Sequence, residues 1–384
     1  NIKGECQMKN IFLEFYGEHK ISPVHTDMNN WTKHVKNRRN LYRQLGIPMQ
    51  CIKGKSLLEF GPGGGYNSLP LITVGEAAHI DMVEPNETGR NEVIELFKSN
   101  NIEPSRYGVH SCILEEYETD QKYDMIMAEQ FIPHLENWKE CLQKIKTFAK
   151  SNTIVIVTAS DEIGFYVERM KRLVGRYMIR DIKEYDQQVT ALVDIFSKQL
   201  DTMNNMTKPY KDWIEDQFMN ETALCGYLMT LKDVMDVFAG EFDVLGTSQS
   251  IFTDYSWYKD LDYDYIAEYK EQYDKKKHMF LLAGDHDETI RTKEENDKLE
   301  EAVSLANRIA AESELSGNYK IEELCTAVDK VSETTDNEKV IKFNNQQIQI
   351  LRAVERGDKV DLSEYTEWSK CFGKTSQFIS LVKR

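Results

Sequence analysis

The chain has 384 residues, of which 41% are hydrophobic, and it carries a formal net charge of −16 at pH 7. This length suggests two domains, or one large domain with insertions, and the apolar content excludes a disordered chain. No apolar run approaches the roughly eighteen residues of a membrane span, and the polar N-terminal stretch lacks the apolar core of a secretory signal. We therefore expect a cytoplasmic protein without a membrane partner.

The acidic charge and the cysteines exclude further classes of protein. Recognition of phosphates needs a basic surface, so a nucleic-acid partner is not expected. Seven cysteines without a Cys-x-x-Cys pair indicate reduced thiols, not a disulfide framework or a cysteine zinc site. The first 55 residues depart from the acidic balance, with ten Lys and Arg against four Asp and Glu.

The N-terminal residues 1–54 are expected to form a helical head. A helix is predicted over Met28–Leu45, where apolar residues recur at helical spacing before a glycine and a proline. The basic residues of this helix have two interpretations. They form a solvated face, or Arg38 or Arg39 clamps an anionic ligand.

From residue 55 to residue 160, short apolar runs alternate with helical stretches. The pattern predicts five strands, at Ser56–Phe60, His79–Glu84, Tyr107–Ile113, Tyr123–Ala128 and Thr153–Ala159. Helices are predicted between them at Tyr66–Val74, Glu87–Ser99 and Leu135–Lys150. Because strand and helix alternate strictly, we expect an α/β fold with a mostly parallel sheet and right-handed crossovers.

Beyond residue 160 the alternation breaks. Residues 161–239 are predicted to form a helical insertion after the fifth strand. Further strands at Phe242–Gly246 and Met279–Ala283 would complete a seven-stranded sheet in a domain spanning residues 55–284. The polar residues 285–384 show helical periodicity, which predicts a helical C-terminal appendage.

The most informative stretch is Glu59–Gly65, which reads Glu-Phe-Gly-Pro-Gly-Gly-Gly. A carboxylate ends a buried strand, and the glycines that follow allow a sharp turn and a close approach of the backbone to a ligand. The dinucleotide fingerprint G-x-G-x-x-G fails, because the required sixth residue is Tyr66 or Ser68. A phosphate-binding loop is excluded too, since no Gly-Lys-Ser/Thr follows.

This acid-x-Gly-x-Gly-x-Gly pattern resembles that of the class I methyltransferases that depend on S-adenosylmethionine (SAM), over about residues 54–160. The resemblance implies a Rossmann-like fold, SAM as the cofactor and S-adenosylhomocysteine as its product. In that family the turn cradles the methionine part of SAM, and the acidic residue holds its ammonium group, which is the role implied for Glu59. Gly61, Gly63 and Gly65 would form the floor of the site, and Phe60 and Pro62 of the same turn are also expected to bind the cofactor.

Later residues fit the same resemblance. Glu84 ends the second predicted strand and precedes Pro85, where the family places a carboxylate that accepts both ribose hydroxyls. After the third strand the family often has an Asp for the adenine amine, whereas Cys112 and Ile113 would supply a backbone amide and an apolar wall here. Glu129, after the fourth strand, would line the methionine side of the pocket.

A base near the methyl group is useful if the acceptor is a hydroxyl or a protonated amine. The candidates are His134 after the fourth strand, His25 in the head and Asp161 after the fifth strand. Each has a structural alternative: a surface or capping histidine for the first two, and the N-cap of the next helix for Asp161. The displacement itself needs no metal, and no spacing of His, Asp and Glu requires one.

A tyrosine-rich segment spans residues 255–273. The spacing of Tyr258, Tyr265, Tyr269 and Tyr273 favours helix packing, whereas Tyr255, Trp257 and Tyr258 would alternatively stack on a sugar or aromatic acceptor.

We expect methyl transfer to an oxygen or nitrogen of a small acceptor. The basic head favours an anionic or sugar-like acceptor, and the head and the insertion would form a lid over it. Two alternatives remain, a protein or RNA methyltransferase and a SAM-binding interaction protein without catalysis. The C-terminal region could serve as a dimerisation element, which would make the protein a homodimer.

Overall fold

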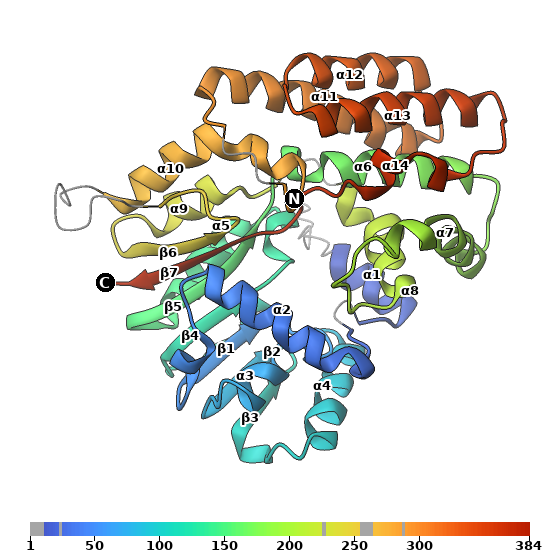
Figure 1. Cartoon of the computed structure of the whole chain (residues 1–384). Helices are drawn as coiled ribbons and strands as arrows, with labels where there is room; N and C mark the ends of the chain where they lie inside the picture. The colour runs from blue at the N-terminus through green and yellow to red at the C-terminus, as the bar shows by residue number, and fades with distance from the viewer. Residues whose placement is uncertain (1–10, 23–24, 225–227, 254–263, 286–288) are drawn as a thin grey trace, which may run out of the picture.

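The computed structural model, drawn in Figure 1, describes residues 11–22, 25–224, 228–253, 264–285 and 289–384. Within these ranges, seven strands form one sheet in the order β3-β2-β1-β4-β5-β7-β6. Their bounds are β1 Ser56–Phe60, β2 His79–Val83, β3 Tyr107–His110, β4 Tyr123–Ala128, β5 Ala149–Ala159, β6 Phe242–Ser248 and β7 Gln377–Lys383. β1 to β5 pair in parallel, and β7 runs antiparallel to both β5 and β6. The expected Rossmann-like α/β fold is therefore confirmed.

The seventh strand is not where the sequence predicted it. Met279–Ala283 was expected to be a strand, but Lys277–Leu281 forms a 3-10 helix whose Phe280 and Leu281 are buried in the core. The last strand in the chain is instead β7, which pairs along its length with β5, for example Ile156 with Ser380. Both segments are short and apolar, and periodicity alone does not separate a strand from a buried turn of this length.

This placement changes the description of the C-terminal region. Helices α11 (Lys293–Ser316), α12 (Ile321–Glu333) and α13 (Glu338–Glu355) come between β6 and β7 in the chain. The chain therefore leaves the sheet, builds these helices and returns to it. The expected boundary at residue 284 separates β7 from the sheet to which it belongs.

Helices cover both faces of the sheet. One face carries α2 (Trp31–Gln44), α3 (Leu69–Thr73) and α4 (Glu87–Ser99), and the other carries α5 (Trp138–Thr147), α6 (Glu162–Met178) and α9 (Leu231–Phe238). Alternate side chains of β1 show why both faces need cover. Leu57 packs with the first group, whereas Leu58 and Phe60 pack with the second.

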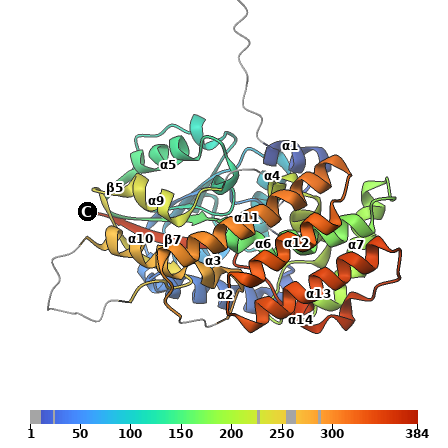
Figure 2. The same ribbon diagram turned by 90° about the horizontal axis from the view of Figure 1, so that it is seen from above.

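The insertion after β5 is helical, as predicted. It contains α6, α7 (Tyr185–Leu200) and α8 (Tyr210–Ile214), and α8 continues as a π-helical turn at Glu215–Met219. In Figure 1 the blue head helix α1 (Ile11–His19) lies beside α7 and α8, although these two helices are far from α1 in the sequence. Figure 2 shows α11 to α13 stacked over α6, which therefore lies between the sheet and the C-terminal helices.

The head contains more structure than the sequence predicted. The expected helix forms as a 3-10 turn at Met28–Asn30 followed by α2, and the Asp27 side chain caps the turn by accepting from Asn29 N at 2.9 Å. Helix α1 had no counterpart in the sequence analysis. No described helix combines the length and the apolar character needed to cross a membrane.

Part of the tyrosine-rich segment is helical. Tyr265, Tyr269 and Tyr273 lie on α10 (Tyr265–Lys276), and the last two are buried, as the helical interpretation predicted. Tyr255, Trp257 and Tyr258 fall outside the described residues.

Candidate active site

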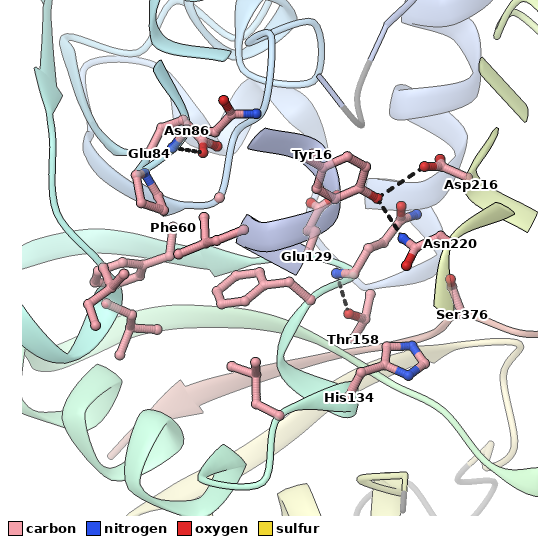
Figure 3. Close-up of a pocket in the computed structure, with 18 of the residues that line it drawn as sticks. Tyr16, Phe60, Glu84, Asn86, Glu129, His134, Thr158, Asp216, Asn220 and Ser376 are labelled. Carbon is pink, nitrogen blue, oxygen red and sulfur yellow. Dashed lines mark hydrogen bonds between the residues drawn. The ribbon is translucent and has the colours of Figure 1, made fainter. Parts of the chain in front are cut away.

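A cavity of about 180 Å³ lies at the carboxyl ends of β1, β2 and β4. In the strand order, β1 lies between β2 and β4, so the chain changes direction across the sheet at this point. Open α/β sheets bind their ligands at such a switch point. The head helix α1, the π-helical turn and the residues just before β7 close the cavity from above (Figure 3).

The glycine turn after β1 has the backbone geometry that its sequence predicted. Gly61, Gly63 and Gly65 all have positive φ, which L side chains rarely adopt. At Gly61, which lines the cavity, a Cβ would lie 3.0 Å from the Phe131 ring. A side chain at this position would therefore both strain the turn and obstruct the floor of the cavity.

Glu84 lies at the end of β2, on the cavity wall. Its Oε2 accepts from Gly63 N and its Oε1 from Asn86 N, each at 2.9 Å, so the carboxylate ties the glycine turn to the start of α4. Burial raises the pKa of Glu84 to about 7. Each oxygen has a second lone pair, so Glu84 retains the capacity to accept from a vicinal diol.

Glu59 lies behind the cavity. Its carboxylate accepts from Ser68 Oγ at 2.5 Å, and burial raises its pKa to about 7. It is not among the lining residues, so the structure does not place it at the cavity as the expected partner of the SAM ammonium group. Four other residues implied by the resemblance also lie outside the lining: Pro62, Gly63, Gly65 and Cys112.

The remaining implied cofactor residues do meet at one cavity. They are Phe60, Gly61, Glu84, Pro85, Ile113 and Glu129. Ile113 and the neighbouring Leu114 form an apolar wall beyond β3.

Glu129 is paired with the head. Arg38 on α2 donates from Nη1 to Oε2 at 2.8 Å and from Nη2 to Oε1 at 2.7 Å, and both side chains are buried. Such a two-pronged pair fixes both groups firmly. Arg38 is therefore engaged by a carboxylate, and Arg39 is exposed, which does not fit the expectation that either clamps an anionic acceptor.

Of the candidate bases, His134 is the one on the cavity wall. Its ring packs edge to face against Phe165, with centroids 5.5 Å apart. Burial, followed by the nearby positive charge of Arg169, lowers the pKa of His134 to about 4. His134 is therefore a neutral imidazole at pH 7, the form that accepts a proton.

The other two candidates have structural positions. Asp161 is the N-cap of α6, accepts from Gly164 N at 2.7 Å and Tyr273 OH at 3.1 Å, and does not line the cavity. His25 also lies outside the cavity and pairs with Asp212 at 3.2 Å. Neither side chain is placed for catalysis at this site. Asp161 instead has the role of helix N-cap that the sequence offered as its alternative.

The structure adds lid residues that sequence reasoning missed. Tyr16 on α1 donates to Asp216 Oδ1 at 3.0 Å, and Asn220 Nδ2 donates to the Tyr16 hydroxyl at 3.1 Å. About two hundred residues separate the partners, so no local pattern could have linked them. At the opposite wall, Thr158 Oγ1 accepts from Gln130 N at 2.5 Å, as Figure 3 shows.

The model of a family described as a methyltransferase domain matches residues 33–228, just over half of the chain. That range holds the glycine turn, Glu84, Glu129 and His134, which the fold brings to one cavity. The chain belongs to the class I methyltransferases. SAM is the cofactor that this family implies, and the residues present fit it: a carboxylate with free lone pairs for the ribose, an apolar wall for adenine and a glycine floor.

Solved structures resemble this methyltransferase only distantly. A protein of Galdieria sulphuraria, named as a proposed sarcosine dimethylglycine methyltransferase, is 11% identical over 97% of this chain and 96% of its own, with a TM-score of 0.38. The CcbJ methyltransferase of Streptomyces caelestis is 13% identical over 40% and 57%, with a TM-score of 0.29. A proposed RNA methyltransferase of Pyrococcus horikoshii is 17% identical over 32% and 55%, with a TM-score of 0.26.

The chain spans just over half of the length of the last two of these structures. A search of curated proteins found no match.

Proposed function

We propose that the protein transfers a methyl group from SAM to a nitrogen or oxygen of a small acceptor. The observation that carries the proposal is the continuity of one cavity. It joins Glu84 and Gly61, on the cofactor side, to His134, Tyr16 and Asp216 on the lid side. A cofactor and an acceptor in one enclosed space have few relative orientations open to them, which is the main requirement for in-line transfer.

The side chains suggest how the cofactor is held. Glu84 would accept from the ribose hydroxyls, and Ile113 and Leu114 would pack against the adenine. Glu129, fixed by Arg38, lines the methionine side. When bound, SAM supplies an electrophilic methyl group on its sulfonium sulfur. When the acceptor atom bonds to the methyl carbon, the carbon–sulfur bond breaks and the sulfur leaves as a neutral thioether.

His134 is the proposed proton acceptor. It lies on the cavity wall and is neutral at pH 7, so its ring is able to accept a hydrogen bond from the acceptor atom, and its lowered pKa makes it a weak base that passes the proton on instead of retaining it. The lid keeps water out of the reaction: Tyr16 comes from the head, Asp216 from the insertion, and the two are hydrogen-bonded to each other.

The charge of the lining supports an uncharged or cationic acceptor instead of an anionic one. The ionisable side chains among the described lining residues are His134, Tyr16 and four carboxylates, and no Lys or Arg lines the cavity there. A carboxylate or phosphate group would meet repulsion without a compensating cation. The carboxylates are Glu84, Glu115, Glu129 and Asp216.

The contacts between the head and the insertion also favour a small acceptor over RNA or protein. The head and the insertion are joined across the cavity by the Tyr16–Asp216 hydrogen bond and, further out, by Lys33 Nζ donating to Asn204 O at 3.2 Å. A macromolecular acceptor would require these contacts to break for each turnover.

Calorimetry with SAM and S-adenosylhomocysteine tests the cofactor assignment. Glu84→Gln should weaken both ligands at least tenfold, because about 1.4 kcal/mol of hydrogen bonding to a charged group is lost. Glu95→Gln, an exposed residue on α4, is the matched control and should leave the affinity unchanged. Equal affinity in wild type and Glu84→Gln would contradict the assignment.

Conversion of SAM to S-adenosylhomocysteine tests the activity. Small amines, alcohols and sugars should be supplied to the full-length chain, with unstructured RNA and a protein mixture as macromolecular acceptors. Turnover with a small compound is the expected result. Turnover with RNA or protein alone would favour that alternative, and cofactor binding without turnover in any arm would favour the interaction protein.

A further inference from the structure

Ser376, in the loop just before β7, is a polar residue on the cavity wall. In Figure 3 it lies on the same side of the cavity as Asn220 and His134, away from Glu84. Its hydroxyl has no hydrogen-bond partner among the described residues. Because a hydroxyl both donates and accepts, Ser376 is open to a polar group of a ligand in the cavity.

The loop that carries Ser376 is held firmly. Glu168 on α6 accepts from Gly373 N through both carboxylate oxygens, at 2.8 and 2.9 Å. A Cβ at Gly373 would collide with a main-chain oxygen of α6, so only glycine permits this close approach. Ser160 Oγ then donates to Thr375 O at 2.8 Å, and β7 begins at the residue after Ser376. The chain on both sides of Ser376 is therefore fixed before a ligand binds.

Gln217, on the π-helical turn, is a second neutral polar residue of the cavity wall. Its main-chain oxygen accepts from Arg172 Nη1 at 3.1 Å, whereas its side-chain amide has no partner in the part of the chain that the structure describes. A ligand that displaced water without offering hydrogen bonds would leave Ser376 and Gln217 unpaired, which costs binding free energy. The wall therefore favours a ligand whose groups both donate and accept, as hydroxyls do.

The charges near His134 favour an uncharged ligand. Burial, followed by the positive charge of Arg169, lowers the pKa of His134 to about 4. Arg169 pairs with Glu162 at 3.3 Å, and its guanidinium carbon lies 5.6 Å from the centre of the Phe165 ring on the cavity wall. This positive charge disfavours a cation beside His134, and the lining carboxylates disfavour an anion.

The weak basicity of His134 also favours a hydroxyl over an amine as the reacting group. A protonated amine has no lone pair with which to attack, and its ordinary pKa of about 10 lies so far above that of His134 that the imidazole does not remove its proton. A hydroxyl oxygen keeps its lone pairs at neutral pH and becomes strongly acidic as it bonds to carbon. A weak base is then sufficient to accept its proton.

We propose that the acceptor is a small, uncharged alcohol with more than one hydroxyl group, and that Ser376 determines this specificity by hydrogen-bonding a hydroxyl other than the one that reacts. The reacting oxygen gives a lone pair to the methyl carbon, the carbon–sulfur bond breaks with its electrons remaining on sulfur, and the hydroxyl proton passes through His134 to water. The inference rests on the methyl transfer proposed above and deepens it by naming the acceptor class.

Three probes with the same three-carbon chain test the acceptor class. Glycerol, n-propanol and n-propylamine should each be supplied with SAM to the full-length chain, and the methylated product should be measured by mass spectrometry. We expect glycerol to be methylated on oxygen with a kcat/KM at least tenfold above that of n-propanol. We expect n-propylamine to give no N-methyl product above the background without enzyme.

The variant Ser376→Ala removes the hydroxyl and keeps the loop. It should lower kcat/KM for glycerol about tenfold, mainly through a higher KM, because one hydroxyl of glycerol is left without a partner. The kcat/KM for n-propanol and the affinity for S-adenosylhomocysteine should stay within twofold, whereas a wall that was merely loosened would lower kcat/KM for both alcohols alike. Ser304→Ala is the matched control, because Ser304 is also half-buried but lies on α11, outside the cavity. It should leave all of these values unchanged.

The outcomes separate the two proposals. Failure of the wild-type chain to bind S-adenosylhomocysteine would overturn the proposed function. If that ligand binds, the acceptor class is overturned by any of three results: n-propanol reacts as well as glycerol, n-propylamine reacts as well as glycerol, or none of the three probes is methylated. The assignment of Ser376 is overturned if Ser376→Ala keeps the preference for glycerol over n-propanol, or if it weakens S-adenosylhomocysteine, since Ser376 would then belong to the cofactor site.

Discussion

Burial moves the pKa values of Glu84 and His134 in opposite directions, and in both cases it favours the neutral form. The pKa of Glu84 rises to about 7 and that of His134 falls to about 4. Glu84 is therefore about half ionised at neutral pH before a ligand arrives. A ribose diol donates to the ionised carboxylate and so stabilises it.

Cofactor affinity should consequently depend on pH. Binding favours the ionised form of Glu84, so affinity for S-adenosylhomocysteine should rise about tenfold as the pH increases from 6 to 8 and the carboxyl loses its proton. Calorimetry across this range measures it. Glu84→Gln should lose most of the dependence, and Glu59, whose pKa is also raised to about 7, accounts for any remainder. A flat profile in the wild type would contradict the role of Glu84.

The same burial affects stability without a ligand. Because the folded pKa of Glu84 lies above its ordinary value, its contribution to stability is present below about pH 4.5 and is lost as the pH rises through 7. The depressed pKa of His134 acts in the other direction: its contribution is present above about pH 6.5 and is lost as the pH falls through 4.

His134 gives a second prediction at the residue scale. His134→Asn removes the proposed proton acceptor and should lower the rate of SAM conversion roughly a hundredfold, the lower bound for loss of a general base. Cofactor affinity should stay within twofold, because no cofactor contact is assigned to this side chain. Unchanged turnover with the best small acceptor would show that the proton leaves by another route.

At the scale of elements, α6 connects the lid to the C-terminal helices. Arg172 lies on α6 and holds the carbonyls of the lid residues Gln217 and Asn220. Its Nε and Nη2 donate to Glu314 of α11 at 2.9 and 2.6 Å, and both side chains are buried. The position of α11 therefore bears on the shape of the cavity wall.

Breaking this link should loosen the lid. Glu314→Gln leaves the buried Arg172 without its counter-charge, which we expect to lower the free energy of unfolding by roughly 3 kcal/mol. Hydrogen exchange at residues 215–220 should increase. Glu322 on α12 is an exposed partner of Arg352 on α13, so Glu322→Gln serves as the control. It should leave hydrogen exchange at residues 215–220 unchanged. Equal exchange in the two variants would rule out the link.

At the scale of the whole molecule, the last described strand, β7, lies in the same sheet as the strands from the first half of the chain. β7 pairs with β5 on one side and β6 on the other, and its core residues Ile379 and Leu381 are fully buried. The loop before it brings Thr375 and Ser376 to the cavity. Sheet, cavity and C-terminal helices are therefore parts of one structural unit.

Truncation at residue 284 should thus abolish folding, because β6 loses its neighbour in the sheet and the cavity loses a wall. We expect no cooperative thermal transition and no binding of S-adenosylhomocysteine, measured by calorimetry against the full-length chain. A truncated protein that melts cooperatively and binds the cofactor product would show that the C-terminal region is an independent appendage after all.

Features that depend only on neighbouring residues are predictable from the sequence. Positive φ at Gly61 follows from the residue type, the five strands from β1 to β5 follow from their apolar runs, and the end of β2 placed Glu84 beside the turn. These features are local, because backbone sterics and strand periodicity act over a few residues.

Which distant groups meet depends on how the complete chain packs. The fold pairs Arg38 with Glu129, brings Tyr16 to Asp216 and places β7 between β5 and β6. An apolar or charged side chain does not encode its partner across two hundred residues. That partner is selected by the packing of the complete chain, in which each buried polar group must find a hydrogen bond.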